Sequence, residues 1–342
     1  MVVLGDALVI EPPLINSSCP WASNLEQLTE LYRSPYTGAI TTRTATMNGF
    51  DEDPNVQTVA FHRTSYSSIN SYGYSPFPLQ QYLSWLEEII ESHPSSNKPF
   101  IISITSSLPD ELATMLDKIL AFRRSVQYLR GNGKMIEIGV ELNTSCPNIP
   151  NKPPPSYDMV TLLPLLEVLS SFHERQLQGD PPLPFYIPIG IKLSPYVHNG
   201  QFTELVSTLR ILKSASGRNA HPISFLTCTN TLGSSLLFQD QIEGAPTRVA
   251  TEFALPSPTG HGGLAGEAIH ALSLGNVQAF SRELERASSD DVRLSGIKII
   301  GVGGVTNREA VLRMKRAGAS VVACATALGK EGVMVFEKLN GP

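Results

Sequence analysis

Short apolar runs alternate with longer amphipathic stretches along this chain. Apolar runs of about four to eight residues bounded by turn formers favour strands, whereas apolar positions repeating every three or four residues favour helices. We therefore expect strands at residues 7–10, 14–19, 38–44, 100–104, 135–142, 186–193, 223–230, 297–302 and 320–325. Helices are expected at residues 25–33, 79–92, 110–129, 159–176, 203–214, 267–286 and 308–317, and residues 333–339 close the chain.

This order gives an entry strand followed by eight strand–helix units, with no break in composition between them. Strands separated by helices form parallel sheets. Eight such units in 342 residues predict an α/β protein with one (β/α)8 TIM barrel domain, residues 1–342, rather than an open sheet. Two long βα connections, residues 45–76 and 231–263, are expected to be irregular insertions that act as lids. The first is too polar to contribute to a core.

Polar side chains stand at the carboxyl ends of nearly all the expected strands. In a barrel these ends converge on one mouth, where ligands bind. A single serine or threonine at a strand end is usually a turn residue or a helix cap, but polar or glycine residues at seven of the eight barrel strand ends predict a site. The residues are Ser17, Ser18, Arg43, Thr44, Asn143, Cys146, Asn148, Lys192, Thr229, Asn230, Thr231, Gly303, Gly304 and Thr326.

Residues 143–148, Asn-Thr-Ser-Cys-Pro-Asn, exchange packing side chains for hydrogen-bonding ones directly after a buried strand. A thiol among such groups serves as a base when its surroundings favour the thiolate, and the amides suit a flat polar ligand. Most free cysteines are buried packing residues, which is the alternative interpretation of Cys146. No histidine is adjacent in sequence, so a Cys–His protease arrangement has no local support.

Glycine-rich segments follow the seventh and eighth strands, at residues 300–306 and 325–328. Barrels frequently bind a phosphate here through backbone N–H groups, and the spacing fits a mononucleotide better than a Rossmann dinucleotide site. An ordinary glycine-rich turn is the alternative. Residues 260–266 form a second glycine-rich turn, which either joins the phosphate site or acts as a hinge.

Lys192 lies in an otherwise apolar strand, where a cation is costly unless it is paired. It therefore either faces an anionic cofactor or substrate, or belongs to a structural ion pair.

Composition narrows the function classes. The net charge is −5 and no block of basic residues occurs, which argues against nucleic acid as a partner. Four cysteines without a CxxC pair indicate free thiols in a reducing compartment, and seven histidines without metal spacing predict no catalytic metal. The N-terminus lacks a signal-peptide pattern and no apolar run is long enough to span a membrane, so we expect a cytoplasmic protein.

Taken together, these motifs resemble the class 1 dihydroorotate dehydrogenases, and most closely the fumarate-using class 1A form. The resemblance extends over almost the full length. Its most specific segments are residues 68–73 (Ser-Ile-Asn-Ser-Tyr-Gly), 142–150 (Leu-Asn-Thr-Ser-Cys-Pro-Asn-Ile-Pro), 190–196 (Gly-Ile-Lys-Leu-Ser-Pro-Tyr), 301–304 (Gly-Val-Gly-Gly) and 327–332 (Ala-Leu-Gly-Lys-Glu-Gly).

The resemblance implies an FMN enzyme of pyrimidine biosynthesis that oxidises (S)-dihydroorotate to orotate, with fumarate as the acceptor, in a homodimer. Cys146 would take a proton from C5 while C6 passes hydride to the flavin, and Lys192 and Arg43 would assist. FMN would be bound by Ser17, Ser18, Arg43, Thr44, Asn143, Lys192, Thr229, Gly266, Gly303, Gly304, Ala325 and Thr326. The substrate would be bound by Arg43, Asn70, Tyr72, Gly73, Tyr74, Asn143, Asn148, Asn230 and Thr231.

This chain departs from the family pattern at four places. Arg43 replaces a lysine, Tyr72 replaces a methionine, and residues 257–259 (Ser-Pro-Thr) lack a lysine that often precedes the glycine-rich loop. Ala325 with Thr326 replaces Gly-Thr. These differences leave two alternatives open: a diverged FMN barrel oxidoreductase with another substrate, and a non-catalytic FMN-binding homologue.

Overall fold

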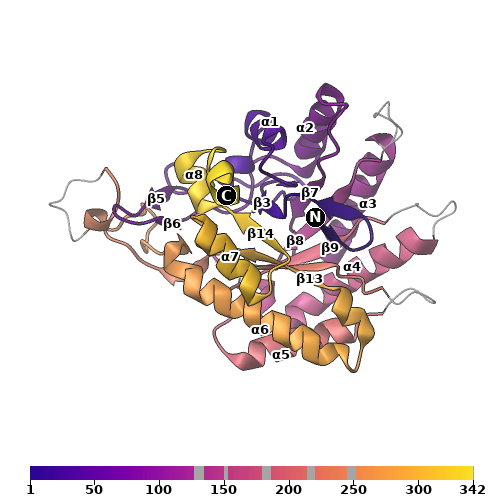
Figure 1. Cartoon of the computed structure of the whole chain (residues 1–342). Helices are drawn as coiled ribbons and strands as arrows, with labels where there is room; N and C mark the ends of the chain where they lie inside the picture. The colour runs from indigo at the N-terminus through magenta and orange to yellow at the C-terminus, as the bar shows by residue number, and fades with distance from the viewer. Residues whose placement is uncertain (127–134, 150–152, 179–185, 214–219, 245–251, 342) are drawn as a thin grey trace.

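The computed structural model describes residues 1–126, 135–149, 153–178, 186–213, 220–244 and 252–341. Within them, eight parallel strands follow one another around a nearly closed barrel in the order β3-β14-β13-β10-β9-β8-β7-β4 (Figure 1). The predicted (β/α)8 barrel is therefore confirmed. The strands are β3 (Leu14–Asn16), β4 (Ile40–Thr41), β7 (Phe100–Ile104), β8 (Ile138–Asn143), β9 (Ile189–Leu193), β10 (Phe225–Cys228), β13 (Lys298–Val302) and β14 (Val321–Cys324).

The barrel closes between β3 and β4 through one side chain. Asn16 is fully buried, its amide Nδ2 donates to the Thr41 carbonyl at 2.6 Å, and its Oδ1 accepts from the Thr41 N–H at 2.9 Å. The Gly38 N–H adds a bond to the Leu14 carbonyl at 2.9 Å. An asparagine amide thus replaces ladder bonds at this seam, where the two strands are too short to pair regularly.

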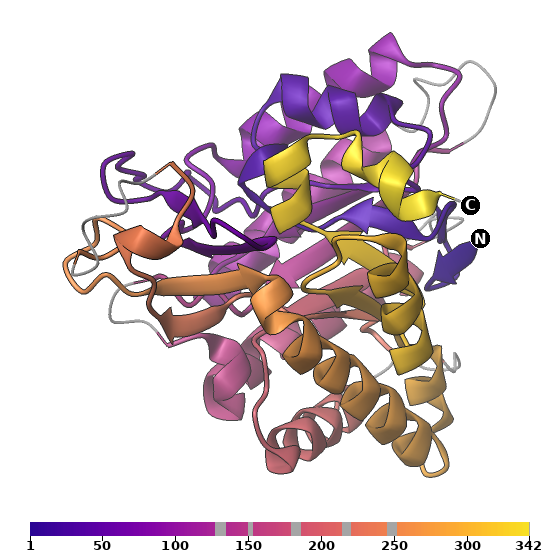
Figure 2. The same cartoon turned by 60° about the vertical axis from the view of Figure 1, so that its left-hand side comes forward.

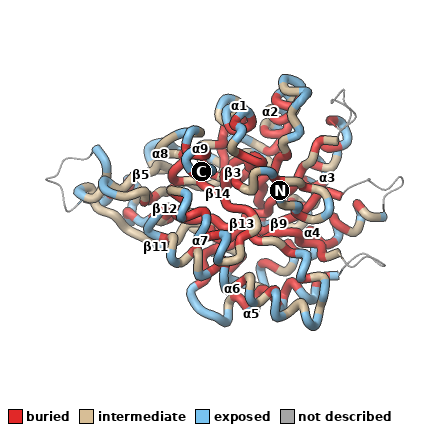
Figure 3. The backbone as a smooth tube through the Cα atoms, viewed as in Figure 1, coloured by how far each residue is buried: buried red, intermediate tan, exposed pale blue. Residues whose placement is uncertain are grey.

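Helices surround the sheet and bury the outward-facing side chains of its strands (Figure 3). Asparagines cap the amino ends of two helices: Asn24 accepts from the Gln27 N–H at 2.9 Å, and Asn307 from the Ala310 N–H at 2.8 Å. Among the described residues, none of the helices is both long and apolar enough to cross a bilayer. The helices are α1 (Leu25–Arg33), α2 (Leu79–Ser92), α3 (Pro109–Val126), α4 (Met159–Gln178), α5 (Asn199–Arg210), α6 (His270–Ser288), α7 (Arg308–Ala317), α8 (Thr326–Glu331) and α9 (Val335–Asn340).

The barrel interior changes from apolar to polar along the strands. A hairpin of β1 (Val2–Leu4) and β2 (Leu8–Ile10) covers the amino end, and Leu4, Leu8 and Ile10 pack with Phe225. Sequence reasoning missed β1. Closer to the carboxyl end, the buried Glu141 carboxylate accepts from the Ser103 and Thr227 hydroxyls, at 3.1 and 2.7 Å. The barrel interior is therefore apolar towards the amino ends of the strands and polar closer to their carboxyl ends.

The two long insertions are only partly irregular, which corrects the sequence prediction. They supply the antiparallel sheet β11-β12-β6-β5, which lies at the opposite end of the barrel from the β1–β2 hairpin (Figure 2). Its strands are short and rich in glycine, serine and asparagine, so their apolar signal is weak. Ala60 and Ile69 also form a small core with Ala254 and Leu255, so the first insertion does bury apolar residues. The strands are β5 (Val59–Phe61), β6 (Ser67–Asn70), β11 (Leu232–Ser235) and β12 (Gly262–Gly266).

Several predicted boundaries also change. The glycine-rich segment 260–266 ends in strand β12 rather than in a turn or hinge, because β6 pairs with it. Strand eight ends at Cys324, and helix α8, which was not predicted, begins at Thr326. Helix α5 begins at Asn199, and residues 267–269 form a 3₁₀ turn before α6. Parts of four predicted segments (110–129, 203–214, 231–263 and the proline-rich loop 149–155) lie outside the described residues.

A substitution at Gly190 would test how tightly the barrel interior is packed. A Cβ at this position would stand 2.1 Å from Cε2 of the fully buried Phe225 ring. We expect Gly190→Ala to lower the free energy of unfolding by about 1–3 kcal/mol, measured by urea denaturation. Gly275→Ala in α6 is the matched control: nothing lies within 4 Å of its Cβ, so helix propensity should raise stability by up to about 1 kcal/mol. Equal effects of the two substitutions would contradict this packing argument.

Candidate active site

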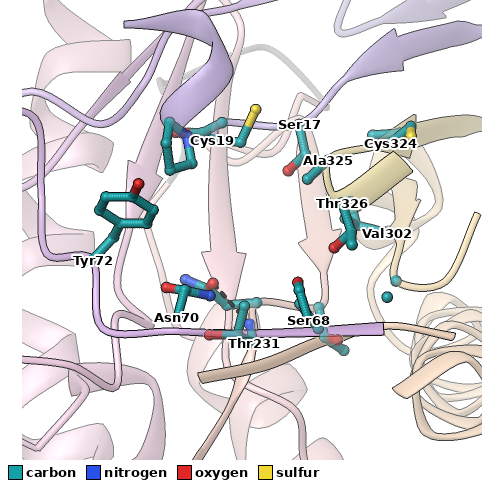
Figure 4. A pocket seen from close by; sticks show the side chains of 18 of the residues that line it. Ser17, Cys19, Ser68, Asn70, Tyr72, Thr231, Val302, Cys324, Ala325 and Thr326 are labelled. Atoms are coloured by element: carbon teal, nitrogen blue, oxygen red, sulfur yellow. Dashed lines mark hydrogen bonds between the residues drawn. The ribbon is translucent and has the colours of Figure 1, made fainter. Parts of the chain in front are cut away.

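A cavity opens at the carboxyl ends of the barrel strands, beneath the small sheet (Figure 4). It encloses about 980 Å³ of empty space, including solvent at its mouth. Its lining contains every predicted site residue except Tyr74. In Figure 4, Tyr72 and Thr326 lie on opposite sides of the cavity. The site therefore has two ends, one near the Asn143–Asn148 segment and one near the glycine-rich loops.

Tyr74 lies outside this lining. Its ring packs edge-on against Phe50, with centroids 5.9 Å apart, and its hydroxyl hydrogen bonds to Thr105. Burial raises the pKa of this hydroxyl well above its ordinary range. The Tyr74 carbonyl accepts a hydrogen bond from Arg43, and the Tyr74 hydroxyl lies close enough to Cys146 for the two groups to interact electrostatically.

Four asparagines form an amide network of two hydrogen-bonded pairs at the first end, Asn70 with Asn148 and Asn143 with Asn230. Asn148 Nδ2 donates to the Tyr72 carbonyl at 2.8 Å and to Asn70 Oδ1 at 3.2 Å. Asn143 donates to Thr44 Oγ1 at 3.0 Å, and its Oδ1 accepts a long bond from Asn230 at 3.4 Å. These bonds fix the orientation of each amide, which favours recognition of a planar ligand edge.

Cys146 lies within this network and is 8% exposed. Its Sγ is 3.9 Å from the Tyr72 carbonyl. Burial raises the pKa of the thiol to about 11, an increase limited by the Asn148 backbone N–H and by the positive charges of Lys192 and Arg43. The thiol is therefore protonated at neutral pH in this structure, and its surroundings contain the cations that would stabilise a thiolate.

Lys192 reaches the cavity from β9 and is 4% exposed. Its Nζ donates to Ser17 Oγ at 3.0 Å and to the Ser18 carbonyl at 3.2 Å, both neutral acceptors. Within the described part of the chain, no carboxylate forms an ion pair with it. The alternative of a structural ion pair therefore has no support, and the buried cation favours an anionic ligand.

Arg43 is also buried, but its charge is paired. Its Nη2 forms an ion pair with Glu52 and donates to the Tyr74 carbonyl at 3.0 Å, and its guanidinium stacks over the Tyr72 ring at 5.3 Å. Sequence reasoning did not identify Glu52, because an acidic residue in a polar loop carries no local signal of its partner.

The other end of the cavity is built from glycine backbone. Gly266, Gly303 and Gly304 have φ values of +77°, +123° and +66°, which disfavour other residues. A Cβ on Gly303 would stand 2.0 Å from Ser273 Oγ. His270 Nδ1 lies 2.8 Å from the Gly303 carbonyl and anchors this loop. The backbone here can approach an anion closely.

Several lining residues were not predicted. Val302 and Ala323 follow the alternation of inward-facing positions on β13 and β14 and were recoverable from the sequence. Trp21 carried no signal, because it reaches the cavity from a 3₁₀ turn, and Ser68 lies in the 68–73 motif but on a strand that was not predicted.

Comparison with known proteins identifies the family. A family model described as dihydroorotate dehydrogenase matches residues 9–341. A relative from Streptococcus pyogenes serotype M5 (strain Manfredo), provisionally named dihydroorotate dehydrogenase A (fumarate), is 28% identical over 327 residues, covering 96% of this chain and 86% of the relative. A relative of the same provisional name from Streptococcus agalactiae serotype Ia is also 28% identical, with 87% of its length covered.

The fold has a solved counterpart in ligand-free DHODH from Eimeria tenella. The TM-score is 0.66 at 15% identity, over 98% of this chain and 85% of that one, which supports the fold alone. The family assignment rests on the match to the family model, which spans almost the whole chain and includes the Cys146 segment. This chain belongs to the dihydroorotate dehydrogenase family.

Proposed function

We propose that this protein is an FMN-dependent dihydroorotate dehydrogenase that oxidises (S)-dihydroorotate to orotate in pyrimidine biosynthesis. One observation carries the proposal: a thiol, four oriented amides and a buried unpaired lysine share a cavity with a glycine backbone cradle. The class 1A assignment, fumarate as acceptor, a cytoplasmic homodimer and a single domain over residues 1–342 are parts of the same proposal, supported by the family resemblance.

The donor set fits FMN. A Cβ on Gly266 would stand 1.9 Å from the Tyr66 carbonyl, and the cradle of Gly266, Gly303 and Gly304 suits a phosphate ester. Lys192 suits a group that carries negative charge when reduced. Bound flavin supplies the acceptor for the two electrons that leave the substrate. Ser17, Ser18, Thr44, Asn143, Thr229, Ala325 and Thr326 are the proposed further contacts.

Residues of the chain orient the substrate and accept its proton. Asn70, Asn143, Asn148 and Asn230 orient the pyrimidine through hydrogen bonds to its N–H and C=O groups. Cys146 accepts the proton from C5, and the Lys192 and Arg43 charges favour the thiolate form needed for this. Burial of the thiol limits exchange of that proton with solvent.

An anaerobic half-reaction tests the proposal. FMN-loaded protein mixed with dihydroorotate is expected to lose its visible flavin absorbance, and fumarate should restore it. Protein that takes up no FMN, or that holds FMN without bleaching on addition of dihydroorotate, would sink the proposed function.

A second candidate is a diverged FMN oxidoreductase of the same barrel acting on a different ring or conjugated acid. The specific observation in its favour is the Arg43–Glu52 pair, which leaves less free positive charge for the carboxylate of dihydroorotate. In that case another reductant would bleach the flavin while dihydroorotate would not.

A further inference from the structure

Glu52, in the loop between β4 and β5, contacts Arg43 in the lining of the candidate active site without lining the cavity itself. Its carboxylate pairs with Arg43, and the two side chains are 17% and 7% exposed. It is absent from the family motifs that carry the resemblance. Because the pair is largely withdrawn from water, its interaction is weakly screened and fixes the geometry of both side chains.

The ion pair with Glu52 occupies the best-placed hydrogen-bond donor of the Arg43 guanidinium. Nη2 donates to the Glu52 carboxylate and to the Tyr74 carbonyl, and Nη1 makes only a long contact of 3.5 Å with Ser23 Oγ. One face of the group is covered by the Tyr72 ring. A ligand carboxylate approaching Arg43 therefore meets a guanidinium whose best-placed donor is occupied and whose charge is partly offset.

The two buried cations of the cavity consequently differ. Lys192 keeps a net positive charge, since its two acceptors are neutral oxygens. The positive charge of Arg43 is partly offset by the carboxylate of Glu52. A buried negative charge disfavours a second anion nearby, so Arg43 discriminates less in favour of carboxylates than a free cation would.

We propose that Glu52 is a specificity-determining positioning residue. It acts through Arg43, lowering the affinity of the site for ring ligands that carry a carboxylate relative to the same ring without one. This inference rests on the proposed function for the place of the ligand, and it deepens that function by assigning the control of substrate charge to a single residue.

Calorimetric titration of FMN-loaded protein with orotate and with uracil, the same ring without the carboxylate, tests the inference. Glu52→Gln keeps an acceptor oxygen for Arg43 and removes the charge. We expect the variant to bind orotate about tenfold more tightly, while the Kd for uracil changes by less than about twofold. A purely structural role would change both affinities alike.

Two further variants control the measurement. Asp51→Asn removes one charge from an exposed neighbour in the same loop and should leave the orotate-to-uracil ratio unchanged. Glu52→Asp retains the charge and should keep the ratio close to wild type. An orotate affinity that is unchanged or weaker in Glu52→Gln overturns the inference, as does a parallel gain for uracil.

The wild-type protein provides a test that needs no variant. With the charge of Arg43 partly offset by Glu52, orotate should bind no more than about tenfold more tightly than uracil at low ionic strength, and a much larger preference overturns the inference. Failure of the proposed function can be told apart from failure of this inference. If the protein shows the expected ratio of orotate to uracil affinity but dihydroorotate does not bleach its flavin, the proposed function is wrong and the role of Glu52 stands.

Discussion

Cys146→Ala is expected to slow the reduction of bound flavin by dihydroorotate by a factor of about 10²–10⁴, with FMN content unchanged. The Cys146 thiol contacts the same Tyr72 carbonyl that Asn148 binds, so its removal leaves the C5 proton without a positioned acceptor. Anaerobic stopped-flow absorbance measures the rate directly, separately from the acceptor half-reaction.

Cys228→Ala is the matched control. Cys228 is a fully buried thiol on β10 whose side chain packs in the hydrophobic core, and it is not among the residues that line the cavity. Its removal should alter stability only and leave flavin reduction at the wild-type rate. Wild-type reduction by Cys146→Ala would remove the thiol from the proposed chemistry.

The pH dependence follows from the raised pKa of Cys146. Burial shifts this pKa upward to about 11, so the thiolate is the minor form at neutral pH and its population grows as pH rises. The reduction rate should therefore increase by about tenfold per pH unit below that pKa. Cys146→Ser should lie below the wild type across this range, since a hydroxyl is a weaker acid than a thiol.

The barrel was predictable because each of its strands is a short apolar run that packs against helices on its outer face. Residues 100–104 form such a run, and β7 has the same limits. The small sheet was not predictable for the opposite reason. The sequence Gly-Gly-Leu-Ala-Gly of β12 has no strand propensity, and its conformation comes from pairing with β6, which is distant in sequence.

The candidate site was likewise predictable in part. Residues at the carboxyl ends of the barrel strands were placed correctly in the cavity lining, because the parallel topology fixes where they point. Tyr74 lies outside the lining, since its ring packs against Phe50, a contact that no periodicity encodes, and its role in substrate binding stays a prediction. The Arg43–Glu52 pair joins a strand end to an irregular loop, a contact that no local pattern encodes.

Lys192→Met is expected to have opposite effects on stability and on function. The wild-type ammonium is buried without a carboxylate partner, so replacing it by an apolar side chain of similar length should raise the free energy of unfolding of the FMN-free protein by about 1–2 kcal/mol. The same change removes the positive charge facing the proposed flavin. It should slow flavin reduction by a factor of about 10²–10³.

Lys98→Met separates this argument from a general effect of removing a buried lysine. Burial lowers the pKa of Lys98 to about 8, but its Nζ donates to the Leu31 carbonyl at 3.3 Å and to Thr37 Oγ1 at 2.8 Å in a structural setting away from the cavity. Lys98 is only half-buried, and its ammonium also donates to the Ser34 carbonyl. Its replacement therefore loses three hydrogen bonds for a smaller gain in desolvation energy than at Lys192, and should lower stability, while flavin reduction stays at the wild-type rate. Urea denaturation of the FMN-free proteins measures the first effect and anaerobic bleaching the second. If Lys192→Met destabilises the protein as Lys98→Met does, Lys192 is a structural residue, and the buried cation no longer argues for an anionic ligand.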